Sequence, residues 1–110
     1  MHELAVTQEI VAAIQQRVGE VDIARVVLEI GTLSGVMPDA LRFCFELCTR
    51  ETALEGAALE IVEIPAHAHC RVCAADFVPD RLVVLCACGS TEIEVFGGQE
   101  LRIKEVEINV

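Results

Sequence analysis

The chain of 110 residues is long enough for one compact domain, and its 54% of hydrophobic residues can fill a modest core. Charges interrupt every apolar run before it reaches the roughly 20 residues of a membrane span, and no basic, apolar leader begins the chain, so we expect a cytoplasmic protein without a membrane partner. The 8 basic and 18 acidic residues give a formal net charge of −10, which argues against a nucleic-acid partner because phosphate binding depends on clustered Lys and Arg.

The first third of the chain predicts a helix followed by a strand. Apolar residues recur at near-helical spacing over residues 4–18, and Gly19 follows as a C-terminal cap, which predicts an amphipathic helix. Residues 21–31 are rich in β-branched side chains and end in a glycine, which is typical of a mostly buried strand.

The remaining regular elements are a second helix and two strands. A proline followed by an aspartate suits the first turn of a helix over residues 38–50. Residues 57–65 predict a strand that a proline ends, and residues 100–110 predict another. The apolar positions of this last strand change parity midway, so we expect a β-bulge near Lys104 and Glu105.

Residues 66–97 differ in character from the rest and contain four of the six cysteines. Cys70 and Cys73 form a C-x2-C pair, and Cys86 and Cys88 form a C-x-C pair further along. Two short turns that each aim two sulfurs at one point supply the tetrahedral ligands of a structural zinc ion. Such a segment holds little else to stabilise it, so we expect the metal to fold it.

Two other chemistries use the same four sulfurs. Two disulfides are disfavoured in a reducing cytoplasm. A rubredoxin-like iron site normally has two residues inside each cysteine pair, whereas the second pair here has one. Outside the four cysteines, we expect His67 and His69 to form a solvated rim around the zinc, with replacement of one thiolate by a histidine as the alternative. Cys44 and Cys48 are expected to pack as small core residues.

The first three residues, Met1, His2 and Glu3, have two interpretations. Glu3 can serve as an acidic residue at the positive end of a helix. Alternatively, the Met1 amine, the His2 amide and the His2 ring can chelate one divalent ion, with the Glu3 amide or carboxylate as a fourth donor, provided that Met1 stays attached. Nitrogen and oxygen donors in a plane suit Ni(II). The residues alone leave both interpretations open.

Taken together, "MHE", "LEIGTLSGVMPDALRFCFE", "LEIVEIPA" before a C-x2-C pair, "CACGS" and "ELRIKEVEI" resemble the HypA/HybF family of nickel metallochaperones over nearly the whole chain. The second cysteine pair is one residue shorter than in many members. The resemblance implies a nickel site at His2 supported by Glu3, and a structural zinc ion held by the four paired cysteines. It also implies three partners: the hydrogenase maturation GTPase HypB, the hydrogenase large subunit and, in some organisms, urease maturation proteins.

These observations predict an α+β fold, with two helices on a roughly three-stranded sheet and an inserted zinc-ribbon-like module. We expect residues 1–65 and 98–110 to form the nickel-binding domain and residues 66–97 to form the zinc module. No catalysis is expected, because the sequence shows neither a nucleotide-binding loop nor a Ser/His/Asp arrangement. Two alternatives of other classes are a zinc-ribbon adaptor that joins proteins without transferring nickel, and a thiol redox protein.

Overall fold

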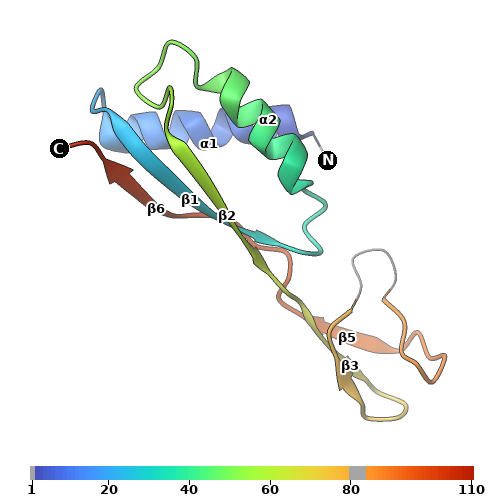
Figure 1. The fold of residues 1–110 in the computed structure, drawn as a ribbon. Coiled ribbons are helices and arrows are strands. Elements are labelled where there is room, and N and C mark those ends of the chain that lie inside the picture. The colour runs from blue at the N-terminus through green and yellow to red at the C-terminus, as the bar shows by residue number, and fades with distance from the viewer. Residues whose placement is uncertain (1, 80–83) are drawn as a thin grey trace.

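The computed structural model describes residues 2–79 and 84–110, which form two helices and two separate three-stranded sheets. The predicted α+β class is therefore confirmed. The molecule is elongated, with principal extents of 54 × 23 × 18 Å. In Figure 1 both helices lie on one side of the first sheet, and the second sheet continues the molecule away from them. Within the described residues, no helix has the length and apolar character needed to cross a membrane.

The first sheet has the strand order β2-β1-β6. Its central strand β1 (Ile23–Gly31) runs parallel to β2 (Ala58–Ile64) and antiparallel to β6 (Leu101–Ile108). The side chains of Val26 and Leu28 in β1 point toward the helices and are completely buried. As expected from its composition, β1 is the most buried element of the chain, because it has a neighbour on each side and two helices above it.

Both predicted helices are present. Helix α1 (Glu3–Val18) ends at Gly19, whose φ of 76° is the left-handed conformation that a glycine adopts most readily. Helix α2 (Pro38–Cys48) begins with its proline in the first turn and ends two residues earlier than expected. Their apolar faces pack against β1 in one core cluster, to which the helices contribute Ile10, Val11, Ile14, Leu41 and Phe45.

The predicted β-bulge in the last strand is confirmed. Val27 of β1 pairs with Glu105 and the next residue, Leu28, pairs with Ile103, so Lys104 has no partner across the strands. Without this extra residue, a strict alternation would place either Ile103 or Val106 on the outer face. The bulge keeps both of these side chains packed against the core.

The outer face of the first sheet carries ion pairs instead of a helix. The Arg25 guanidinium lies 2.6 Å from a Glu60 oxygen and 3.3 Å from a Glu107 oxygen, and it thereby joins all three strands. Arg102 of β6 lies 2.7 Å from Glu29 of β1. These partly exposed pairs fix the strand register more than they add stability.

The second sheet has the order β4-β3-β5, with β3 (His67–Cys70) in the centre and β4 (Asp76–Phe77) and β5 (Ile93–Phe96) antiparallel to it. The end of β1 joins the two sheets through backbone hydrogen bonds. The N–H of Thr32 donates to the Ile64 carbonyl, and the N–H of Leu33 donates to the Gly98 carbonyl. The chain therefore enters and leaves the second sheet beside the same turn.

Close backbone packing at this junction requires glycine. A Cβ on Gly31 would lie 2.1 Å from the carbonyl carbon and oxygen of Gly98, and a Cβ on Gly98 would lie 2.4 Å from the Cβ of Ala66. No side chain larger than hydrogen fits at either place without a backbone shift. At the junction, the main chain of each glycine therefore packs directly against its neighbour, the backbone of Gly98 for Gly31 and Ala66 for Gly98.

Candidate metal centres

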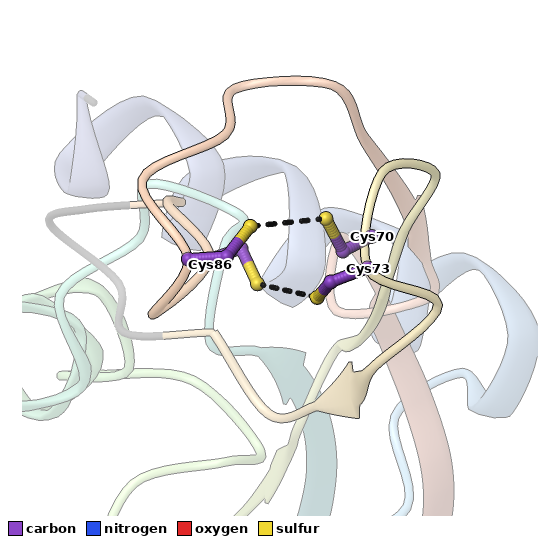
Figure 2. A group of neighbouring side chains, drawn as sticks. Cys70, Cys73 and Cys86 are labelled. Carbon is purple, nitrogen blue, oxygen red and sulfur yellow. Dashed lines mark hydrogen bonds between the residues drawn. The ribbon is translucent and has the colours of Figure 1, made fainter.

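The sulfurs of Cys70, Cys73, Cys86 and Cys88 lie within 4.8 Å of one another. Cys70 Sγ lies 3.7 Å from Cys88 Sγ, and Cys73 Sγ lies 3.5 Å from Cys86 Sγ. Figure 2 shows Cys70 and Cys73 facing Cys86 from the opposite loop. Four sulfurs around a zinc ion with bonds of ~2.3 Å are separated by about 3.8 Å in a regular tetrahedron. The cluster is therefore close to the size that a zinc ion needs.

The two cysteine loops share one backbone design. In the first, the N–H of Ala74 donates to the Cys70 carbonyl at 2.9 Å, and in the second the N–H of Gly89 donates to the Cys86 carbonyl at the same distance. Both donors have a positive φ, 62° at Ala74 and 90° at Gly89. The shorter C-x-C pair thus closes its turn one residue earlier, and its two sulfurs still reach the common centre.

The four sulfurs differ in exposure and in acidity. Cys70 and Cys86 are buried, whereas Cys73 and Cys88 are exposed. A hydrogen bond from the Cys73 backbone lowers the pKa of Cys70 to about 6. At Cys86 the Cys88 backbone acts in the same direction, but burial and the neighbouring thiols outweigh it and raise the pKa to about 12. The Cys70 thiolate therefore forms readily in the metal-free cluster, whereas ionisation of Cys86 needs the charge of a cation.

The two histidines before the first cysteine pair lie on β3 and differ in their surroundings. His69 Nδ1 is 2.6 Å from Asp76 Oδ1, across the β3–β4 pairing. His67 is exposed and pairs across the strands with Phe96, at the end of β3 away from Cys70. The Asp76 partner was not predicted, because the sequence carries no signal for a strand of two residues.

At the other candidate site, His2 is exposed and forms the N-cap of α1. Met1, which we expect to supply the terminal amine, lies outside the described residues. The carboxylate of Glu3 accepts a hydrogen bond from the N–H of Met37, 3.1 Å away, and this bond lowers the pKa of Glu3. The Glu3 side chain is thus fixed at the start of α2.

Cys44 and Cys48 lie one turn apart on α2 and are partly buried. Cys48 packs against the core cluster, as expected for a small hydrophobic residue. Burial raises the pKa of its thiol. Neither thiol belongs to the four-cysteine cluster.

Comparison with known proteins decides the family. A sequence profile described as "Hydrogenase/urease nickel incorporation, metallochaperone, hypA" matches residues 1–108. The chain belongs to the HypA family. Hydrogenase maturation factors HypA from Nostoc punctiforme and Geotalea uraniireducens are 49% and 47% identical to it, over 98% of this chain and 96% and 99% of theirs.

The fold agrees with that assignment. The solution structure of the Ni metallochaperone HypA from Helicobacter pylori superposes with a TM-score of 0.65 at 27% identity, and the match covers 98% of this chain and 97% of that one. The predicted resemblance to the HypA family is therefore confirmed. The chain is a member of a family of nickel-incorporation metallochaperones and carries a four-cysteine cluster suited to a metal ion.

Proposed function

We propose that this protein binds Ni(II) at its amino terminus and delivers it during maturation of [NiFe]-hydrogenase, with urease as a further recipient. The observation that carries the proposal is the match to the HypA profile from residue 1 to residue 108, which includes the amino terminus. The nickel ion is cargo, and the protein acts as a carrier and not as an enzyme. Its partners on this proposal are the maturation GTPase HypB and the hydrogenase large subunit, in the cytoplasm.

The start of α1 supports a nickel site built on His2. The first hydrogen bond of the helix runs from the N–H of Val6 to the carbonyl of His2, so the His2 amide takes no part in the helical ladder. That nitrogen can bind a metal without loss of helical structure. Together with the Met1 amine and the His2 ring it forms adjoining chelate rings, which suit the planar coordination of Ni(II).

Exposure of the site suits a carrier. His2 is accessible, so a recipient's ligands can approach the ion directly. Protons compete with nickel for an imidazole of reference pKa ~6.5 and an α-amine of ~8, so affinity falls as the pH falls. Glu3 supports the site because its carboxylate accepts a hydrogen bond from the Met37 N–H, which holds the first turn of α1 against α2.

We further propose that Cys70, Cys73, Cys86 and Cys88 hold a structural Zn(II). An all-thiolate tetrahedral site is typical of zinc, and the sulfur separations fit it. On this proposal residues 66–97 form a zinc module inserted into the nickel domain of residues 1–65 and 98–110.

Calorimetric titration of the zinc-loaded protein with Ni(II) tests the nickel site. We expect saturable binding to the wild type, and loss of that binding in His2→Ala and in protein with an acetylated terminal amine. His67→Ala is the matched control, because it removes an exposed histidine elsewhere. Unchanged nickel binding in both altered proteins would overturn the proposal and favour an adaptor without nickel transfer.

A further inference from the structure

An apolar groove runs between α1 and β6. It consists of two adjoining hollows, of about 570 and 220 Å³, which share Ala13 of the helix and Ile103 of the strand. In the larger hollow the apolar lining includes Ile14, Val18 and Val106. Neither hollow contains residues of the four-cysteine cluster or of the amino terminus.

The groove exists because two helices cover three strands unequally. Val26 and Leu28 in the central strand are fully buried, whereas Ile103 and Val106 of β6 are only partly buried although they belong to the same face. The edge of the helix-covered face therefore keeps apolar surface in contact with water. Such surface beside an edge strand is a common site of protein recognition.

Two cations that are unpaired among the described residues line the larger hollow. Arg17 comes from the last turn of α1 and Lys104 is the bulged residue of β6, and neither forms an ion pair with any residue that the structure describes. Glu105 also lines this hollow, but its carboxylate lies 3.9 Å from Arg25. The chain has 8 basic and 18 acidic residues and a net charge of −10, so two free cations beside an apolar groove make this part of the surface opposite in sign to the protein as a whole.

The β-bulge contributes to this arrangement. It frees Lys104 from the alternation of the strand and lets it line the groove with Arg17. Bulges frequently redirect a side chain toward a functional site. The smaller hollow is lined by Glu9 and by Arg102, which is already paired with Glu29, so the free positive charge is confined to the larger hollow.

We propose that this groove docks an acidic amphipathic segment of a partner protein. Its apolar side chains enter between α1 and β6, and its carboxylates pair with Arg17 and Lys104. The charge of the rim selects this occupant, because a basic segment would meet two unneutralised cations. The larger hollow, where the two cations lie, contains none of the first three residues and none of the four cysteines, so we expect docking there to be independent of nickel binding.

Two capped peptides provide the probes. Both have leucines at i, i+4 spacing, and one has glutamate where the other has lysine between them. Titration into the isotope-labelled, zinc-loaded protein is followed by backbone amide NMR shifts. We expect saturable binding of the glutamate peptide, with the largest shifts at Ala13, Ile103 and Val106, and weaker binding of the lysine peptide.

Charge-reversed variants make the test specific. The pair Arg17→Glu and Lys104→Glu should weaken binding of the glutamate peptide by about tenfold or more, since each reversal turns an attraction into a repulsion. The matched control reverses Arg42 of α2 and Arg50, which lies two residues after the end of that helix, and it changes the net charge equally. Ala13→Phe places a ring where the two hollows adjoin without changing the charge, and it should also weaken binding. This variant keeps the test decisive if the reversed pair does not fold.

The outcomes that would overturn the proposal are distinct. They are absence of saturable binding by the glutamate peptide, equal affinity for both peptides, unchanged affinity in both groove variants, or a concentration-dependent self-association that occupies the groove with a second copy. Nickel titration of the same variants separates the two proposals, because the groove variants should bind Ni(II) as the wild type does.

Discussion

The carboxylate of Glu3 accepts a hydrogen bond from the backbone N–H of Met37, with 3.1 Å between oxygen and nitrogen. This contact joins the first residue of α1 to the N-cap of α2 and lowers the pKa of Glu3. Both helix starts are electropositive, so an ionised carboxylate between them is favourable. The first turn of α1 is therefore held against the start of α2.

Glu3→Gln should make stability less dependent on pH. Because the folded-state pKa lies below the ordinary 4.5, ionised Glu3 stabilises the fold above pH 4.5, and this contribution is lost as the pH falls through the lowered value. The variant should therefore melt at a lower temperature than the wild type above pH 4.5, and the difference should shrink in acid. Thermal melts from about pH 7 to about pH 3 check this, with Glu9→Gln as control. A difference that stays constant across that range would contradict the assignment.

Gly31→Ala should destabilise the protein by about 3 kcal/mol or more, because its Cβ would overlap the backbone of Gly98, which cannot rotate away as a side chain can. Gly35→Ala is the control. It has a φ of 80° but no neighbouring atom within 4 Å, so only the conformational cost of about 1 to 2 kcal/mol applies. Urea unfolding measures both variants. Equal losses would show that the junction is not tightly packed.

Ala74→Gly should stabilise the zinc-loaded protein by about 0.5 kcal/mol. Ala74 has a φ of 62°, and the relief of roughly 1 to 2 kcal/mol of left-handed strain exceeds the 0.4 to 1 kcal/mol that glycine adds to the entropy of the unfolded chain. Ala87→Gly, inside the other cysteine pair, has no such strain to relieve and should destabilise. Denaturant unfolding of the two variants distinguishes these signs, and a loss of stability in Ala74→Gly would refute the argument.

Cys73→Ser should abolish tight zinc binding and lower the melting temperature by about 5 °C or more, since a hydroxyl replaces one of four thiolates and metal binding supplies folding energy. Elemental analysis of the purified protein, followed by calorimetry, gives both quantities. Cys44→Ser should retain its zinc, because Cys44 lies on α2 outside the cluster. A full zinc content in Cys73→Ser would remove this residue from the ligand set.

The elements that the sequence predicts well are those with a strong local signal. Helical spacing and capping residues located α1 and α2, and the change of parity in the last strand located the bulge at Lys104. The strand order β2-β1-β6 could not be predicted, because pairing depends on contacts between residues far apart in the chain. A second irregularity, at Ala24 of β1, also carries no pattern.

For the candidate sites, the sequence predicted the clustering of the cysteine sulfurs but not the hydrogen-bond partners of the neighbouring polar side chains. Cysteine spacing indicated the cluster of four sulfurs, since each pair lies within one turn. The partners of Glu3 and His69 were not foreseen, because Met37 and Asp76 reach them only through helix packing and strand pairing. The roles of His2 and Glu3 in nickel binding, and of the cysteines as zinc ligands, stay predictions.

The unequal exposure of the four sulfurs has a kinetic consequence. Cys73 and Cys88 are exposed and Cys70 and Cys86 are buried, so a chelator reaches an ion in the cluster more easily beside the first two thiolates than beside the other two. Removal of the ion should then proceed by stepwise displacement of the two accessible thiolates, at a rate that rises with chelator concentration. The bonds from the ion to the buried thiolates of Cys70 and Cys86 would then break last during removal and form first when the ion rebinds.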